Sequence, residues 1–383
     1  MLTEIVLKDY TTFLEETKFD FKATNYKILE DTNVNKDRIL KGSLLVGENA
    51  SGKTQVLDSI VLLLNLLLDN SEQNYFTKKS FYTKGDKFSL KYTFNVSNSE
   101  IKYEVTFNDN SINSEKLYVN NELKLNRLNK NGQTNFGEEK DNKDINDDLS
   151  LLKLEYYNTK FNNDPILNEW FEFLKNSIYV NCLTGRIKSF NPSKITEQNI
   201  FKYAEANDET ELNNLLSKFD YNSELVFIKQ SLNHSKQLLS NKNLVCLRKK
   251  GTGVSLPISM ESTGNQAFMN VLLPINYGVK NNCMVIVDEF SSGLHNELEE
   301  ALIKYFFNNS INSQIFFTSH STNLLDTSIL RPDQIYSFKF DSKEGTQIKR
   351  FSDENPRESQ NIEKMYLNGV FDGMPNYNKE FKD

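Results

Sequence analysis

The sequence predicts an α/β fold that carries an antiparallel β lobe and a mainly helical insertion. Three observations predict it. A glycine-rich loop at residues 47–54 joins a short apolar segment to a long apolar stretch with helical spacing. Apolar and polar residues alternate between Lys87 and Val119, as they do in antiparallel strands. The last third of the chain returns to short apolar strands separated by an amphipathic helix, a pattern typical of a parallel sheet.

The glycine-rich loop has the complete form GxxxxGK(S/T), and a strand expected at 43–46 and a helix expected at 55–68 flank it. Its glycines let the backbone N–H groups point at a phosphate, and the helix adds the positive end of its dipole. The alternative, a glycine turn before a core helix, is weaker, because such an octet arises by chance about once in a hundred chains of this length. We therefore expect ATP and Mg²⁺ to bind at Gly47, Glu48, Asn49, Ala50, Ser51, Gly52, Lys53 and Thr54.

Within this loop, Lys53 and Thr54 carry the expected chemistry. The Lys53 ammonium would bridge the β- and γ-phosphates, and the Thr54 hydroxyl would bind Mg²⁺.

The pattern divides the chain into an N-terminal lobe at 1–125, the insertion at 126–250 and a C-terminal lobe at 251–383. Further strands of the N-terminal lobe are expected at 2–7 and 19–21.

The insertion begins with an almost wholly polar stretch at 129–148, which predicts a surface loop. A helix is expected at 168–175, a strand at 177–182, and a mainly helical stretch with breaks at 195–239.

The C-terminal lobe supplies a second set of candidate residues. An apolar strand at 283–287 runs directly into Asp288 and Glu289. At the carboxyl end of such a strand, Asp288 would help to hold Mg²⁺ and Glu289 would polarise the attacking water. Two ionised acids there would be costly to desolvate without a cation. The next strand, 314–318, ends next to His320, which would reach the γ-phosphate from the same sheet.

A further candidate binding segment lies between the phosphate loop and Asp288 in the sequence. Residues 260–266 read MESTGNQ and lead into an apolar helix expected at 267–273. Ser262 and Gly264 could offer a hydroxyl, backbone N–H groups and a helix dipole to an anion. Taken alone, the segment is more often a helix cap.

Composition restricts the classes of partner and compartment. The formal net charge is −7 and the pI about 5.3, so no overall cationic field attracts nucleic acid or an anionic membrane. Three scattered cysteines indicate a reducing compartment and no metal site. The N-terminus lacks signal-peptide character, and the apolar stretch 60–68 is too short to span a bilayer. We expect a cytoplasmic protein without a membrane partner.

Taken together, the motifs resemble a known ATPase group. GENASGKT, ESTGNQ, VIVDEFSSGLH and FTSHSTNLLD, in this order, are similar to an ABC-type ATPase head related to the chromosome-maintenance and double-strand-break-repair ATPases. More narrowly, the chain resembles the bacterial AAA ATP-binding proteins of abortive-infection and phage-defence loci, the OLD-like, Septu, PARIS and RloA-like group. The segments 331–336, 366–369 and 373–375 match the usual ending of that group.

The resemblance implies an ABC/SMC-like P-loop NTPase head with ATPase activity. It makes Lys53 and Thr54 ligands of phosphate and Mg²⁺, Asp288 the second Mg²⁺ partner, Glu289 the catalytic base and His320 the γ-phosphate sensor. Ser262 and Gly264 would form a signature motif that completes the site of the opposite subunit. A homodimer or higher oligomer is therefore expected.

The resemblance also places an interface loop, and the chain departs from the group at two positions. The loop that crosses the dimer interface would contain Leu294 and His295. Asn265 and Asn296 stand where the group usually has Thr and Pro, and Gln73 is a weak candidate for a glutamine loop.

Three functions follow from these features. The leading hypothesis is an ATPase of an anti-phage system, whose nucleotide-driven dimerisation controls a separate nuclease or toxin, because only 63 residues follow His320. The alternatives are a DNA repair or recombination ATPase that acts directly on DNA, and a nucleotide-gated scaffold with little turnover. DNA or a phage component stays open as a further partner.

Overall fold

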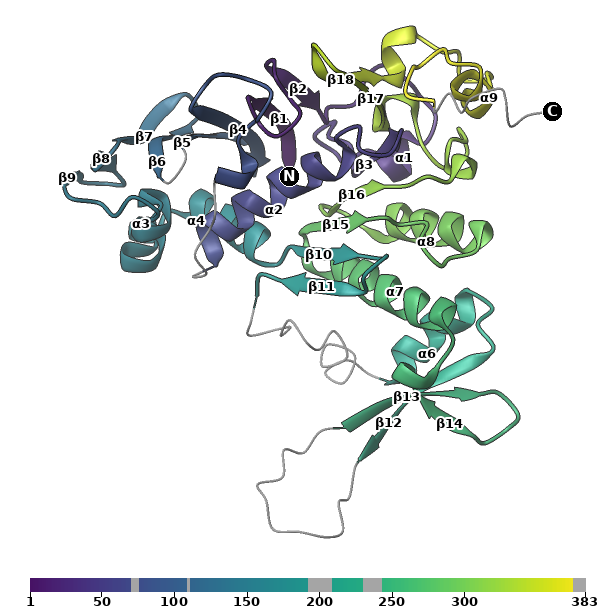
Figure 1. The fold of residues 1–383 in the computed structure, drawn as a ribbon. Coiled ribbons are helices and arrows are strands. Elements are labelled where there is room, and N and C mark those ends of the chain that lie inside the picture. Colours follow the sequence, from purple (N-terminus) through teal and green to yellow (C-terminus); the bar gives the residue numbers. More distant parts are fainter. Residues whose placement is uncertain (70–75, 109–110, 192–208, 230–242, 375–383) are drawn as a thin grey trace.

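The computed structural model of the chain describes residues 1–69, 76–108, 111–191, 209–229 and 243–374. Two large sheets lie side by side, and a smaller one projects away from them (Figure 1). Within the described residues, no helix has the length and apolar character needed to cross a membrane.

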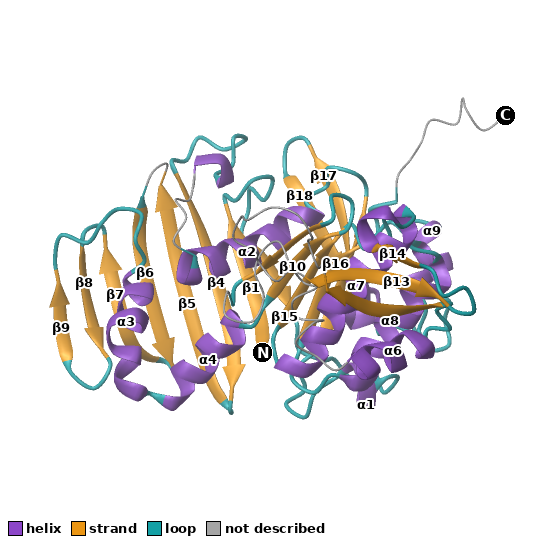
Figure 2. Ribbon diagram, turned by 90° about the horizontal axis from the view of Figure 1, so that it is seen from below, coloured by secondary structure: helices purple, strands orange, loops and turns teal. Residues whose placement is uncertain are grey.

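The first sheet is antiparallel and has eight strands in the order β2-β1-β4-β5-β6-β7-β8-β9. In β5, buried residues alternate strictly with partly exposed ones, so only one face meets the core. Helices α2 (Lys53–Leu68), α3 and α4 lie against the sheet (Figure 2) and share its core. Trp170 is fully buried in this core. The strands and the two later helices are β1 Leu2–Lys8, β2 Thr17–Asp20, β4 Lys87–Val96, β5 Ser99–Asn108, β6 Ile112–Val119, β7 Glu122–Leu128, β8 Asn131–Asn135, β9 Glu139–Asn142, α3 Leu151–Thr159 and α4 Pro165–Lys175.

The second sheet has seven strands in the order β11-β10-β15-β16-β3-β17-β18. Its five central strands are parallel, and β11 and β18 are antiparallel edges. Alternate residues of β15 and β16 face the α2 core and the α7–α8 core. Its elements are β3 Gly42–Gly47, α2 Lys53–Leu68, β10 Ile178–Asn181, β11 Arg186–Ser189, α7 Thr263–Asn281, β15 Met284–Asp288, α8 Asn296–Asn309, β16 Gln314–Thr318, β17 Ile335–Asp341 and β18 Gly345–Arg350.

The small sheet is antiparallel and has the order β12-β13-β14. It projects beyond α7 (Figure 1). The remaining elements are β12 Ser223–Lys229, β13 Asn243–Lys249, β14 Ser255–Pro257, α1 Glu30–Asn33, α6 Glu209–Lys218, α9 Ile362–Leu367 and the 3-10 turns Phe76–Lys78, Lys160–Asn163, Ile258–Met260, Thr322–Leu324, Pro332–Gln334 and Phe351–Glu354.

The prediction of a surface loop at 129–148 is wrong, because β8 and β9 extend the antiparallel sheet there. Gly132, Thr134 and Phe136 alternate toward the core, and polar residues occupy the exposed positions. A strand near a solvated sheet edge needs few apolar residues, so composition alone does not reveal it.

The insertion at 126–250 is also less helical than predicted. Its described residues hold α3, α4 and α6 together with six complete strands, β8 to β13, and the boundary at 125 falls inside β7. Of the stretch 195–239, residues 209–229 are described, and they form α6 and β12. The strands and helices expected in the two lobes are confirmed, with ends that differ by a few residues.

Candidate functional site

The phosphate-loop motif connects β3 to α2, as the sequence predicts. Gly47 and Gly52 have φ values of 141° and 109°, in the region that favours glycine. A Cβ atom on Gly47 would lie 2.3 Å from the Phe338 carbonyl oxygen, and one on Gly52 would lie 2.7 Å from Thr346 Oγ1. Both positions therefore require glycine for conformation and for space. The resulting curl leaves Asn49 and Ala50 exposed.

Lys53, the first residue of α2, is buried beneath this curl. Its Nζ atom donates to the carbonyl oxygens of Gly47 at 2.8 Å and Glu48 at 2.6 Å. Burial lowers the pKa of Lys53, and the nearby charges of Glu289, Asp288 and Glu48 oppose that shift. The ammonium thus lies among the loop carbonyls, in reach of an anion at the mouth of the loop.

Asp288 is the last residue of β15 and is buried. Its Oδ1 atom accepts hydrogen bonds from Thr54 Oγ1 at 3.1 Å and from Thr318 Oγ1 at 2.7 Å. The structure therefore brings together the two residues that the sequence assigns to Mg²⁺. A hydroxyl and a carboxylate are oxygen ligands of the kind Mg²⁺ prefers, and the ion usually completes its shell with phosphates and waters. The chemistry of the pair fits this ion.

Glu289 and His320 face one another across the carboxyl ends of β15 and β16. The distance from His320 Nε2 to Glu289 Oε2 is 3.7 Å, and both side chains are partly exposed. Glu289 has a φ of 55°, a left-handed conformation that costs about 1–3 kcal/mol in a residue other than glycine. This conformation turns the chain directly after Asp288.

Several of these residues line a cavity of about 740 Å³. Its lining takes in the start of the phosphate loop, the two facing side chains and the C-terminal segment: Val46, Gly47, Asn49, Ala50, Leu183, Glu289, Ser319, His320, Ser321, Thr322, Leu325, Tyr366 and Met374. Five of the sequence-predicted residues, Gly47, Asn49, Ala50, Glu289 and His320, therefore border one cavity.

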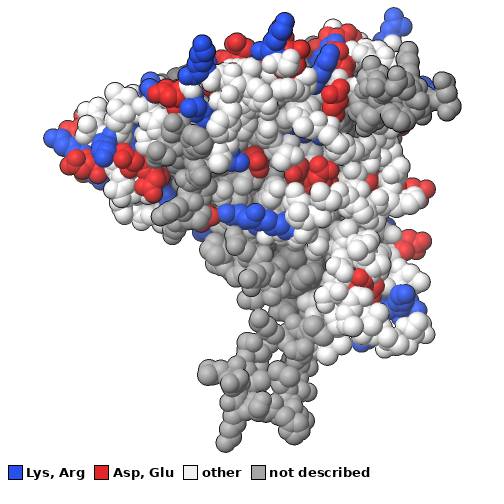
Figure 3. Space-filling model, viewed as in Figure 1, with Lys and Arg blue, Asp and Glu red and all other residues white. Residues whose placement is uncertain are grey.

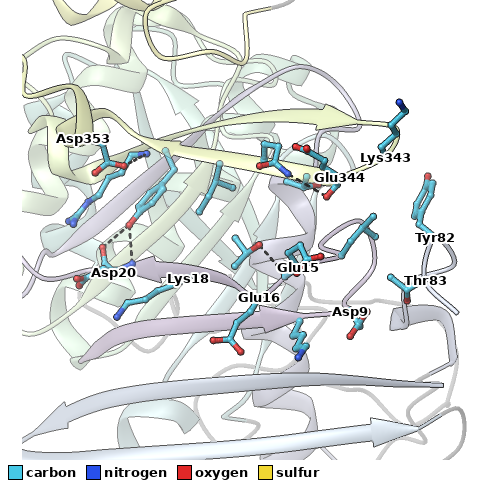
Figure 4. Close-up of a pocket in the computed structure, with 18 residues that line it drawn as sticks. Asp9, Glu15, Glu16, Lys18, Asp20, Tyr82, Thr83, Lys343, Glu344 and Asp353 are labelled. Carbon is cyan, nitrogen blue, oxygen red and sulfur yellow. Dashed lines mark hydrogen bonds between the residues drawn. The ribbon is translucent and has the colours of Figure 1, made fainter. Parts of the chain in front are cut away.

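A larger cavity, of about 1120 Å³, lies between β2 and the β17–β18 hairpin. Acidic and basic side chains mix along it, among them Glu15, Glu16, Lys18, Lys343 and Glu344 (Figure 4). We place the candidate functional site at the smaller cavity, because Gly47, Asn49 and Ala50 of the phosphate loop line it together with Glu289 and His320, and none of these residues lines the larger cavity.

Two residues of the site were missed by the sequence analysis. Asn181 ends β10, in register with Asp288, and its Nδ2 atom donates to Asp288 Oδ2 at 3.2 Å. Its Oδ1 atom accepts from the backbone N–H of Thr184 at 2.9 Å. Thr318 ends β16, and its hydroxyl accepts from the Glu289 N–H at 2.8 Å while it donates to Asp288. The sequence signal that could have identified Asn181 and Thr318 is that each is a polar residue at the end of a predicted strand.

Ser262 and Gly264 do not line the cavity of their own chain. Ser262 caps α7, because its side chain accepts from the Asn265 N–H at 3.3 Å. A Cβ atom on Gly264 would lie 3.5 Å from the Gly293 carbonyl oxygen, so the segment packs on the loop before α8. In that loop, His295 caps α8. Gln73, the candidate for a glutamine loop, lies outside the described residues.

Comparison with known proteins identifies the family. Residues 43–326 match the family described as "AAA domain, putative AbiEii toxin, Type IV TA system". The chain belongs to this AAA family. The match includes the phosphate loop, Asp288, Glu289 and His320, but not the antiparallel strands β1 and β2 or the hairpin β17–β18. No curated protein sequence matches this AAA protein.

Solved structures share the fold of the AAA protein. The structure titled "Crystal structure of the SmcHead bound to the C-winged helix domain of ScpA" has a TM-score of 0.53 at 12% identity, and the alignment covers 91% of this chain and 97% of that one. The "SMC head domain from Thermotoga maritima" has a TM-score of 0.48 at 14% identity, with the same two coverages, 91% and 97%. The predicted ABC/SMC-like P-loop NTPase head is confirmed as the fold of the chain.

Proposed function

We propose that this AAA protein binds ATP with Mg²⁺ and hydrolyses it, and that nucleotide-driven dimerisation controls a separate effector in bacterial phage defence. The observation that carries the enzymatic part is that the phosphate loop, Glu289 and His320 border one cavity, while Thr54, at the end of that loop, is hydrogen-bonded to Asp288, the neighbour of Glu289 in the chain. Phosphoryl transfer to water depends on positioning and on charge stabilisation, and this set supplies both.

Each side chain has a role in this proposal. Lys53 and the N-terminus of α2 bind the phosphates, and Thr54 with Asp288 holds Mg²⁺, which would neutralise charge on the phosphate oxygens. Glu289 accepts a proton from the attacking water, since its carboxylate is partly exposed to the cavity. His320 contacts the γ-phosphate from the neighbouring strand. Thr318 fixes the two acids relative to each other.

Dimerisation is supported by what surrounds the site. Ser262 and Gly264 do not line the cavity of their own chain but stand at the N-terminus of a 19-residue helix, where an anion would be stabilised. Leu183 and Met260 are each 71% exposed, the first beside the cavity and the second two residues before Ser262. Single exposed apolar side chains are common on protein surfaces, so the dimer proposal rests on the Ser262 segment rather than on these two residues. A second copy would bring its Ser262 segment to the cavity of the first.

Control of an effector is supported by the family. Its description refers to a toxin and a type IV toxin–antitoxin system, which fits a chain that acts together with another protein. In this proposal the nuclease or toxin is a separate chain that responds to the nucleotide-bound dimer.

The test of the enzymatic part compares the wild-type protein with Glu289→Gln. The variant keeps the shape of the side chain but loses the base, so MgATP turnover should fall roughly 100- to 10,000-fold while ATP still binds. Size-exclusion chromatography with ATP should show more dimer for Glu289→Gln than for the wild type without nucleotide. Equal turnover of the two proteins would refute Glu289 as the base, and identical elution would refute nucleotide-driven dimerisation.

The shared site can be tested with Ser262→Arg. This change should leave nucleotide binding nearly intact and abolish ATP-dependent dimerisation and hydrolysis. In a mixture with Lys53→Ala, one heterodimer site combines an intact phosphate loop with an intact Ser262 segment, so part of the activity should return. Full activity of Ser262→Arg alone would mean that the segment is only a helix cap.

Direct action on DNA is the second candidate. Arg248, Lys249 and Lys250 are exposed at the end of β13, on the projecting small sheet, and form a local cationic patch. Against it stands the net charge of −7 and the mixing of acidic and basic side chains on the face seen in Figure 3. Binding of the purified protein to duplex DNA, with affinity that falls steeply with salt, would favour this candidate. The third candidate is a nucleotide-gated scaffold. If the protein has this function, the wild type should bind ATP and hydrolyse it at a negligible rate.

A further inference from the structure

The loop that carries His320 is held from two sides. Three consecutive side chains after His320 contact different parts of the molecule. Ser321 Oγ donates to Glu299 Oε1 at 3.2 Å, and Thr322 Oγ1 donates to Glu363 Oε1 at 2.7 Å. Asn323 Nδ2 donates to the Asn296 carbonyl oxygen at 3.3 Å. The loop is therefore tied to α8 on one side and to α9 on the other.

The imidazole of His320 has few restraints of its own. The side chain is 43% exposed, and its ring contact with Glu289 spans 3.7 Å. Its backbone N–H donates to Ser291 Oγ at 3.4 Å, which is a long bond. Because these contacts are weak, the position of the ring depends on the loop that follows it.

The carboxyl group of Glu299 is buried in the core, where it should lower the stability of the fold. Only 1% of the residue is exposed, and its Oε2 atom has no hydrogen-bond partner among the described residues. Burial raises the pKa of Glu299, and the hydrogen bond from Ser321 opposes that shift. A buried carboxyl group destabilises the fold unless its contacts compensate. The contact that it makes is with the loop carrying His320.

Glu363 connects helix α9 to the loop that follows His320, because it accepts the hydrogen bond from Thr322. Helix α9 also supplies Tyr366, which lines the cavity and whose hydroxyl donates to the Gly373 carbonyl oxygen at 3.1 Å. Tyr366 packs on the ring of Phe351, at a centroid distance of 5.8 Å. The helix is thus anchored in the C-terminal core and offers a fixed acceptor to Thr322.

We propose that Glu299 and Glu363 are positioning residues, which act through Ser321 and Thr322 to hold His320 toward Glu289 and the cavity. This inference rests on the proposed function, since it assumes that His320 assists ATP hydrolysis. Displacement of a catalytic group by about 1 Å can cost roughly 100-fold in rate. The two carboxylates should therefore affect turnover without any contact to ATP.

The first experiment removes each acceptor in the full-length protein. Glu299→Leu and Glu363→Ala should lower kcat for MgATP, by up to about 100-fold for Glu299→Leu. The KM for ATP and the affinity for a non-hydrolysable ATP analogue should stay unchanged, because the phosphate loop is intact. Glu299→Gln and Glu363→Gln keep an acceptor oxygen and should retain most of the activity. Glu297→Gln, an exposed acid on the same helix α8, is the matched control and should behave as the wild type.

The loop side offers an independent route if Glu299→Leu does not fold. Ser321→Ala and Thr322→Val remove the same two hydrogen bonds and leave both carboxyl groups in place. They should lower kcat in the same way as the acceptor variants. Wild-type kcat in Ser321→Ala and Thr322→Val would overturn the proposal.

The decisive measurement repeats these changes in a His320→Ala background. If the carboxylates act through His320, Glu299→Leu and Glu363→Ala should cause no further loss there. An equal loss in both backgrounds would mean a purely structural role and would overturn the proposal. If His320→Ala itself keeps wild-type kcat, the assumed role of His320 is wrong, and the positioning proposal fails with it. If His320→Ala is slow and the acceptor variants are not, only the positioning proposal is wrong.

Discussion

Both large sheets contain buried charged side chains, but the hydrogen-bond partners of these side chains differ between the two sheets. In the antiparallel sheet, Glu115 accepts from Tyr103 Oη at 2.9 Å, from Ser150 Oγ at 2.6 Å and from the backbone N–H groups of Leu151 and Leu152 at 2.8 and 3.1 Å. Its neighbour Arg127 donates to three backbone carbonyl oxygens. Both side chains are fully buried.

In the parallel sheet, the charges lie at an open edge. Lys53 and Asp288 are buried, but Glu289 and His320 border the cavity. The partners of Lys53 are the carbonyl oxygens of the phosphate loop itself. Removing one partner of a fully paired buried charge destabilises a fold, whereas charges gathered at a cavity are candidates for chemistry. The comparison predicts that substitutions near the cavity lower ATPase activity, whereas substitutions of the buried pair in the antiparallel sheet lower stability.

The largest effect is expected from Lys53→Ala. This change removes the charge that we propose to bind phosphate and that is not required for packing, so ATP binding or hydrolysis should be abolished while the thermal unfolding temperature changes little. Isothermal titration with ATP and a turnover assay would measure it, with Lys84→Ala at an exposed lysine as the control. Normal turnover of Lys53→Ala would remove the basis for the site.

Arg127→Ala should show the opposite behaviour. Removing one partner of a buried ion pair leaves an uncompensated charge, and the free energy of unfolding should fall by about 3–5 kcal/mol. Denaturant unfolding followed by circular dichroism would measure the loss. The folded fraction should hydrolyse ATP at the wild-type rate, and a selective loss of turnover without a loss of stability would contradict the division between the sheets.

The smallest effect is expected from Asn181→Ala. Its amide orients Asp288 without being one of the proposed Mg²⁺ ligands, and removal of such an outer contact typically costs 10- to 100-fold in metal affinity or activity. The concentration of Mg²⁺ needed for half-maximal turnover should rise, while ATP binding without Mg²⁺ should stay the same. Unchanged Mg²⁺ dependence would show that Thr54 and Thr318 orient Asp288 sufficiently.

The parts of this molecule that sequence predicts well are those with a strong local constraint. Gly47 and Gly52 have positive φ and no room for a side chain, so the phosphate loop can be recognised from eight residues. Asp288 follows an apolar strand, and its position at the carboxyl edge of a sheet could be inferred from that alone.

The parts that sequence misses depend on pairing between distant segments. Asn181 meets Asp288 only because β10 pairs with β15, and no local pattern specifies that neighbour. The composition of β8 and β9 predicts a loop, because these strands are held by hydrogen bonds to the sheet and contain few apolar residues. The same holds for Glu299 and Glu363, whose contacts with the loop after His320 appear only in the fold.

The order of strands also affects how this protein can be made. Strand β3, which precedes the phosphate loop, pairs only with β16 and β17 in the described structure. Gln314, at the start of β16, bonds to the Leu40 carbonyl oxygen 274 positions earlier. At synthesis rates of about 5–20 residues per second, the ribosome needs roughly 14–55 s to cover that separation. During this time a nascent chain carries the motif GENASGKT without the strands that support it, so ATP binding would begin only after β16 and β17 have been synthesised.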